Sequence, residues 1–303
     1  LQKVLQHTTG EISSLDKAIS SDPSSYALMA MRDSLEKRLH NLEEDFLIES
    51  HKMGLDICSY RMFVENGNPN VHSFASTLDQ FQKLVTSFFS AIKNGPKRRS
   101  TFSAEDANLT EFNLGYVYPG SVGFVLTINN ERLLTIESEL DESIDLIFQM
   151  VELSSSEQIK LFLEKLGAGP VHAFYNWVNS NAKLGLGADI DWRRGELVRS
   201  KALIQSYKFE ELSRVLDSTG DEKTSDFEII GFLTAVNMRS KSFTIEPENA
   251  ERIHGNFKDA IDESHDVTLP TKRYKAYLTK TSITKCSKEE EEEAYFLNKI
   301  EPV

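Results

Sequence analysis

The segment from Asp189 to Lys201 has the spacing of side chains that most suggests catalysis. Asp189, Asp191 and Glu196 precede Lys201, and in a strand Asp189 and Asp191 would share one face because side chains alternate. Clustered carboxylates can bind a divalent metal ion that activates water for phosphodiester hydrolysis. A nuclease strand of the restriction type has acid, any residue, lysine, whereas Lys201 follows Glu196 by five positions. The alternative is an ordinary polar strand face with cross-strand ion pairs.

Other catalytic signatures are missing from the sequence. It has no GxxxxGK[ST] phosphate loop, no G-x-S-x-G elbow, no HExxH and no CxxC. Its seven histidines are scattered, so we expect no metal site and no cofactor. Cys58 lies in an expected buried strand, and Cys286 lies beside an acidic run that would raise its pKa. We therefore assign no catalytic residue and expect a protein that is not an enzyme.

The charge balance argues against nucleic acid as a partner. The chain carries 34 basic and 47 acidic side chains, a net charge of −13, and binding to a phosphate backbone needs clustered basic residues. Two small clusters exist, Lys97-Arg98-Arg99 and Arg193-Arg194 with Arg199 and Lys201. Each could hold a phosphate or could be solvated. No apolar run approaches ~18 residues and the first ten residues lack a signal-peptide core, so we expect no membrane partner and a cytoplasmic location.

Residues 1–50 are predicted to form a hairpin of two amphipathic helices. The second helix has an apolar stripe at three-to-four-residue spacing, formed by Leu28, Met31, Leu35, Leu39 and Leu42. The two helices together carry more apolar stripe than a lone hairpin can cover, so a hairpin alone would leave apolar surface exposed. We expect it to pack on the rest of the chain or on a second copy, so these five residues are the predicted interaction surface of a homo-oligomer.

Residues 51–217 are predicted to form a central α/β region with an antiparallel meander. Its strands are expected at 112–118, 122–128 and 133–136, after an earlier strand at 54–64. Residues 97–110 look like a mobile polar loop. A helix is expected to begin with a capping box made by Ser154 and Glu157.

Residues 226–303 are predicted to form a small OB- or SH3-like β-barrel. The polar segment 218–225 reads as a linker that separates it from the central region. Gly231 lies inside the long first strand and fits a bulge. The five glutamates at 289–293 are expected in a solvated loop. The protein is thus predicted to be α+β.

Together these patterns favour a non-catalytic protein-interaction or assembly subunit that self-associates. The first alternative is a metal-dependent hydrolase or nuclease subunit centred on Asp189, Asp191 and Glu196. The second is a component of a prokaryotic anti-phage defence system, which rests only on the pairing of a motif-poor chain with a small barrel. Protein is favoured over nucleic acid as the partner of the barrel, because residues 221–303 are net acidic and exposed aromatics on a basic groove are not evident.

Overall fold

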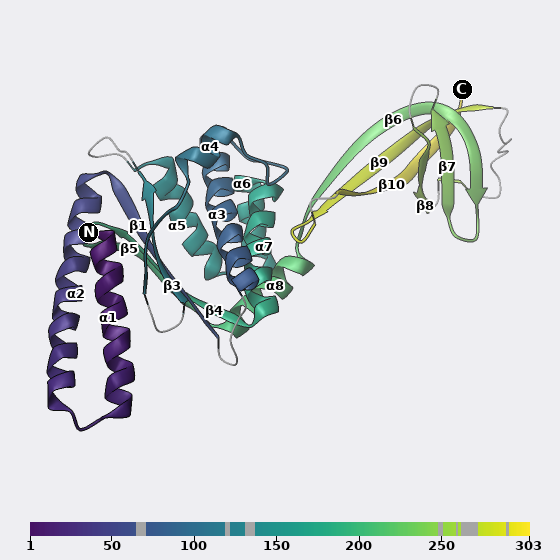
Figure 1. The fold of residues 1–303 in the computed structure, drawn as a ribbon. Coiled ribbons are helices and arrows are strands. Elements are labelled where there is room, and N and C mark those ends of the chain that lie inside the picture. Colours follow the sequence, from purple (N-terminus) through teal and green to yellow (C-terminus); the bar gives the residue numbers. More distant parts are fainter. Residues whose placement is uncertain are drawn as a thin grey trace. The chain divides into compact units, whose positions relative to one another are not determined.

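The computed structural model describes residues 1–64, 71–118, 122–130, 137–247, 251–258, 260–261, 272–288 and 291–303. These residues form two compact units, Leu1–Thr219 and Gly220–Val303. The first holds a pair of helices and a sheet with further helices, and the second is a closed barrel (Figure 1). The predicted α+β fold class is confirmed. None of the described helices is long and apolar enough to cross a membrane.

The N-terminal hairpin consists of two long antiparallel helices, α1 (Gln2–Ser21) and α2 (Tyr26–Lys52). The turn between them is held by Asp22, whose Oδ1 accepts a hydrogen bond from the backbone N–H of Ser24 at 3.3 Å. An ion pair between Arg32 and Asp16, 2.7 Å apart, joins the two helices across the hairpin.

The sheet of the first unit is antiparallel throughout. Its strands lie in the order β2-β3-β1-β4-β5. They span Leu55–Val64 (β1), Asn113–Tyr118 (β2), Val122–Asn129 (β3), Leu186–Arg194 (β4) and Leu197–Ile204 (β5). The first two strands of the predicted meander are β2 and β3, whereas its third strand, at 133–136, lies outside the described residues. On the edge of β3 away from β2, the neighbouring strand is β1, which comes from an earlier part of the chain.

Within the described part of the first unit, six helices follow the hairpin, and most of them pack on one face of the sheet while the hairpin lies on the other (Figure 1). The core of this layer is aromatic: Trp177 is fully buried, and its Nε1–H donates to the buried Tyr60 hydroxyl at 3.0 Å. The helices are Val71–Asn94 (α3), Ala104–Leu109 (α4), Glu139–Val151 (α5), Ser156–Leu166 (α6), Ala168–Leu184 (α7) and Ser206–Ser218 (α8).

The segment predicted as a mobile loop, residues 97–110, is structured instead. It contains α4, and its first residues pair with the α6–α7 junction: Lys97 N–H donates to Leu166 O at 2.8 Å, and Gly169 N–H donates to Lys97 O at 2.9 Å. Glycines permit this approach. A Cβ on Gly169 would lie 2.2 Å from the carbonyl carbon of Arg99, and Gly167 has φ +83°.

Replacing Gly169 with alanine should therefore destabilise the first unit, although alanine normally favours a helix. We expect a loss of about 1–3 kcal/mol, because the backbone at Arg99 must shift. In the control, Gly10→Ala in α1, the new Cβ meets nothing within 4 Å. That control should stabilise by up to about 1 kcal/mol. Urea unfolding of both variants tests the pair, and a gain of stability in Gly169→Ala would contradict the tight contact.

The predicted capping box of α6, made by Ser154 and Glu157, does not form. Ser155, not Ser154, is the N-cap, and its Oγ accepts from Gln158 N–H at 3.4 Å. A complete capping box occurs at α5 instead. There Ser138 Oγ accepts from Asp141 N–H at 3.1 Å, and Ser138 N–H donates to Asp141 Oδ2 at 3.0 Å.

The second unit is a closed barrel of five strands, as predicted. Around the barrel the order is β10-β8-β7-β6-β9, and β10 pairs parallel with β8. This is a Greek-key barrel with the connectivity of an OB-fold. The strands are Gly220–Asn237 (β6), Ser242–Pro247 (β7), Ile253–Phe257 (β8), Arg273–Lys285 (β9) and Glu291–Pro302 (β10). Buried side chains such as Phe243, Phe257 and Leu278 fill its interior.

Three local predictions for the barrel were wrong. Residues 218–225 are not a linker: they comprise the end of α8 and the start of β6. Residues 220–225 of β6 pair with residues 280–285 of β9. The bulge in β6 falls between Leu233 and Ala235. Gly231 instead allows the close approach of β7, since a Cβ on this residue would lie only 2.6 Å from Glu246 O. Residues 291–293 of the acidic run pair with β9, where Lys280 forms an ion pair with Glu293 and Lys285 forms one with Glu292.

Candidate interaction surface and polar clusters

The predicted acidic cluster is split between separate ion pairs on the sheet. Asp189 and Asp191 share the face of β4 that is opposite to the main helical layer. Asp189 Oδ2 accepts from Arg61 at 2.9 Å, and Asp191 Oδ2 accepts from Arg193 at 2.8 Å. Lys201 lies directly across from Asp191 in the strand register, and Glu196 lies in the β4–β5 turn.

This arrangement is a polar strand face in which arginines balance the aspartates. Among the residues that the structure describes, no group of three or more His, Cys, Asp or Glu side chains could hold a metal ion. Asp189, Asp191 and Glu196, whose spacing suggested a hydrolase, therefore do not come together in one carboxylate cluster. One atom is left without a partner: the buried Asp191 Oδ1 has no hydrogen bond within the described residues.

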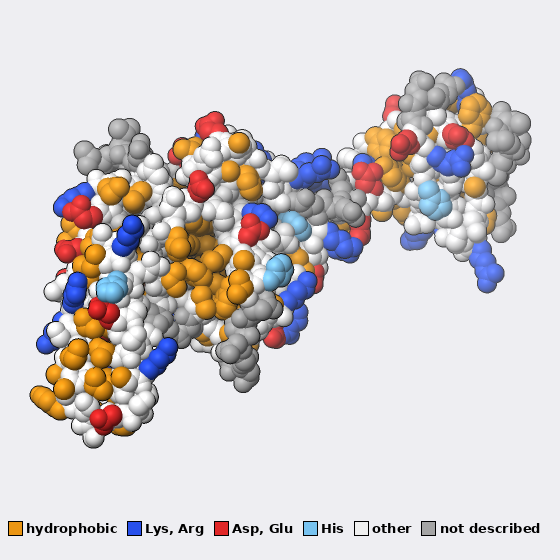
Figure 2. Space-filling view, in the orientation of Figure 1, with side chains coloured by type: hydrophobic (Ala, Val, Ile, Leu, Met, Phe, Trp, Pro, Cys, Tyr) orange, Lys and Arg blue, Asp and Glu red, His pale blue; other side chains and the backbone are white. Residues whose placement is uncertain are grey.

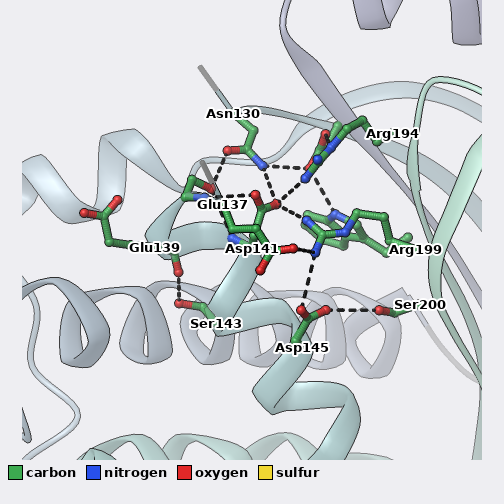
Figure 3. A network of polar contacts seen from close by, with 12 residues as sticks. Asn130, Glu137, Glu139, Asp141, Ser143, Asp145, Arg194, Arg199 and Ser200 are labelled. Atoms are coloured by element: carbon green, nitrogen blue, oxygen red, sulfur yellow. Dashed lines mark hydrogen bonds and ion pairs between the residues drawn. The ribbon is translucent and has the colours of Figure 1, made fainter. Parts of the chain in front are cut away.

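Two of the four residues in the second basic cluster of the sequence, Arg194 and Arg199, belong to a buried network (Figure 3). Its centre is Asp141, whose side chain is completely buried at the start of α5. Asp141 Oδ1 accepts from Arg194 Nη2 at 2.7 Å, from Asn130 Nδ2 at 3.1 Å, and is in contact with Arg199 Nη1. A carboxylate that meets two guanidinium groups in a buried site forms strong, charge-assisted interactions.

Further side chains extend this network across the sheet. Asn130 also donates to Asp56 Oδ2 at 2.7 Å, and Trp192 Nε1–H donates to the same oxygen at 3.2 Å. Arg199 reaches Asp145 at 3.3 Å and Glu137 at 3.1 Å.

The network joins the first turn of α5 to the ends of β1, β3, β4 and β5. Because acidic side chains surround both arginines, neither presents a free positive charge. The geometry therefore does not favour phosphate binding by this cluster. Arg194 and Arg199 are also more buried than side chains on a solvated strand face would be. Asp56, Asn130 and Asp141 were missed in the sequence. The available signal was the pattern of Ser138 followed three residues later by Asp141, a capping box.

Both cysteines are buried, which removes them as nucleophiles in the folded protein. Cys58 and Cys286 are each 0% exposed. Burial raises the pKa of the Cys58 thiol far above its usual range, and the negative charge of Asp191 adds to the rise. A protonated, buried thiol is unreactive.

The predicted interaction residues of α2 separate into two groups. Leu39 and Leu42 pack against a buried cluster between the hairpin and the sheet, which includes Leu5, Phe46 and Ile57. They are part of the internal packing. Leu28 and Leu35 are half-buried and Met31 is 56% exposed.

The far part of the hairpin has no interior of its own. From residue 13 to residue 45 no side chain is buried, although both helices carry apolar stripes there. Figure 2 shows hydrophobic side chains gathered on the surface at this end of the hairpin. An open groove of about 600 Å³ runs along one side of the pair, where Gly10 and Ser14 of α1 face Met31 and Leu35 of α2.

Comparisons with known proteins give no relative: no family model, no curated protein and no solved structure matches this chain. Its function is therefore inferred from geometry. Among the features above, the far part of the hairpin is the surface whose apolar side chains lack a covering layer.

Proposed function

We propose that the protein is a non-catalytic assembly subunit that self-associates through the far part of its helical hairpin. The observation that carries the proposal is the absence of any buried side chain between residues 13 and 45, in helices that nevertheless have apolar stripes. Helices in water gain most of their stability by packing an apolar face. A second hairpin laid on this groove would complete a four-helix arrangement.

Charge supports a second copy as the partner. The whole chain has a net charge of −13, so two copies repel each other on average. Residues 13–39 have no net charge, because Asp16, Asp22, Asp33 and Glu36 are balanced by Lys17, Arg32, Lys37 and Arg38. The acids at 43–45 lie outside this segment, toward the sheet end of the hairpin. Two such neutral segments can approach without a net repulsion. The groove is also open at Gly10, where a Cβ would meet nothing within 4 Å, so a partner helix has room there.

A charged residue at the groove should dissociate the assembly. We expect light scattering to show a dimer or larger species for the full chain at micromolar concentration. Met31→Lys should raise the dissociation constant about tenfold or more, since a buried lysine without a partner is costly. Met53→Lys is the matched control, because Met53 is 70% exposed at the end of α2 and does not line the groove. A monomeric full chain, or equal effects of both substitutions, would refute the proposal.

A second variant separates assembly from folding. Gly10→Gln should stabilise the helix by about 0.5–1 kcal/mol, because it meets no atom of its own chain at Cβ. Its longer side chain should fill the groove and weaken association. A variant that unfolds at higher urea concentration and yet scatters as a smaller species is the expected result. Unchanged association in this variant would place the interface elsewhere.

A further inference from the structure

A second hollow lies between α2 and the sheet. This cleft has a volume of about 330 Å³, at the lower end of the range of roughly 300–1,000 Å³ that is usual for ligand pockets. α2 contributes Glu43 and Phe46, β2 contributes Tyr116 and Tyr118, and β4 contributes Arg193. The cleft therefore has room for a small molecule, and its lining combines aromatic rings with charge.

Glu43 is a half-buried carboxylate that lines this cleft. Its Oε1 accepts a hydrogen bond from the Tyr116 hydroxyl at 3.4 Å, and it makes no ion pair with any lysine, arginine or histidine among the described residues. Burial raises the pKa of Glu43, while the Tyr116 hydroxyl and the nearby His40 and Arg193 oppose the rise. A cation placed beside this half-buried acid would stabilise its charged form.

The basic groups at the cleft are already balanced by other acids. Arg193 donates through Nε at 3.2 Å and Nη2 at 2.8 Å to the same oxygen of Asp191. His40 lies 3.3 Å from Glu44 on the next turn of α2. An incoming anion would thus meet an arginine whose charge is largely neutralised, together with the repulsion of Glu43.

Aromatic rings supply the remaining walls. Phe46 and Tyr116 meet edge to face with their centroids 5.5 Å apart. Burial raises the pKa of Tyr118 to about 12, so its phenol is neutral at physiological pH. Neutral aromatic rings attract a cation placed over a ring face, by about 0.5–2 kcal/mol.

We propose that this cleft binds a small organic cation, with a flat amidinium or guanidinium group held by Glu43 and packed against Tyr116 and Tyr118. A planar cation of this kind can donate two hydrogen bonds to a carboxylate in one plane. The inference is independent of self-association, because the cleft and the groove share no lining residue.

Three probes of nearly equal shape test the charge preference directly. Benzamidine is cationic, benzamide is neutral and benzoate is anionic. Titration of the full chain, followed by NMR chemical shifts or by calorimetry, should show saturable benzamidine binding in the millimolar range or tighter. Benzamide should bind about tenfold more weakly, and benzoate more weakly still, which corresponds to roughly 1.4 kcal/mol for the first step.

Two variants assign the effect to the cleft. Glu43→Gln keeps the size of the side chain and should bring the affinity for benzamidine down to that for benzamide, leaving benzamide binding unchanged. Tyr118→Leu should weaken benzamidine and benzamide together but keep the preference for the cation. Glu49→Gln is the matched control on the same helix, because Glu49 pairs with Lys52 at 2.8 Å on the surface.

The proposal is overturned by any of three outcomes. These are no saturable binding of benzamidine by the folded parent protein, equal or tighter binding of benzoate, and a Glu43→Gln variant that binds benzamidine as the parent does. A fall in affinity that Glu49→Gln reproduces would also count against it, since the effect would then be one of overall charge.

Discussion

Replacing Asp141 with alanine is expected to lower the free energy of unfolding of the first unit by about 3–5 kcal/mol. The side chain is fully buried and serves Arg194, Arg199 and Asn130 at once. Without it, two arginine side chains that are only 26% and 12% exposed lose their central counter-charge. The capping box at the start of α5 is lost as well, which adds to the cost.

Tryptophan fluorescence during urea unfolding measures this effect. Both tryptophans of the sequence, Trp177 and Trp192, lie in the first unit, so their signal does not report on the barrel. Glu142→Ala is the control, because the neighbouring Glu142 forms an ion pair with Lys165 in which both side chains are 49% exposed. Such a pair contributes about 0–1 kcal/mol. If the two substitutions cost the same, the network does not stabilise the fold as described.

Replacing Trp177 with alanine is expected to be equally severe, with a loss of about 3–5 kcal/mol. The ring is fully buried and lies 5.2–5.8 Å, between centroids, from the rings of Phe81, Phe174 and Phe209. Its removal leaves a cavity between α3, α7 and α8 and deprives the Tyr60 hydroxyl of its donor.

Circular dichroism during urea unfolding follows this variant, with Trp192 as a remaining fluorescent probe. Tyr207→Ala in α8 is the control, since Tyr207 is 65% exposed, and should change stability by less than about 0.5 kcal/mol. Trp177→Phe should fall between the two, because it retains a ring but loses the hydrogen bond. A mild effect of Trp177→Ala would show that the helical layer closes over the space.

Periodicity predicted the elements of this fold well, because it depends on nearest neighbours along the chain. The hairpin, the β2–β3 pair and the barrel each have local patterns of apolar side chains and turns. The errors occurred where long-range contacts override local composition. Residues 97–110 are polar, but Lys97 is held by backbone partners on α6 and α7. The acidic residues 291–293 are paired with β9 for the same reason.

The candidate sites could not be predicted, because they depend on strand register. Asp56 and Trp192 are 136 positions apart and meet only when β1 pairs with β4. Glu43 has no motif around it, and it becomes part of a cleft only when α2 packs beside Tyr116. The interaction stripe of α2 was visible in the sequence, but its division was not: Leu39 and Leu42 pack inside, whereas Met31 lies on the groove.

The central position of β1 has a consequence for how the chain reaches its native state. β1 is an early segment, yet it pairs on one side with β3 and on the other with β4, which lies about 130 residues further along the chain. During synthesis, its second edge stays open until residue 194 has left the ribosome. High contact order of this kind slows folding, and an unpaired strand edge favours aggregation. The first unit should therefore mature late and slowly, and truncation before β4 should give an insoluble product.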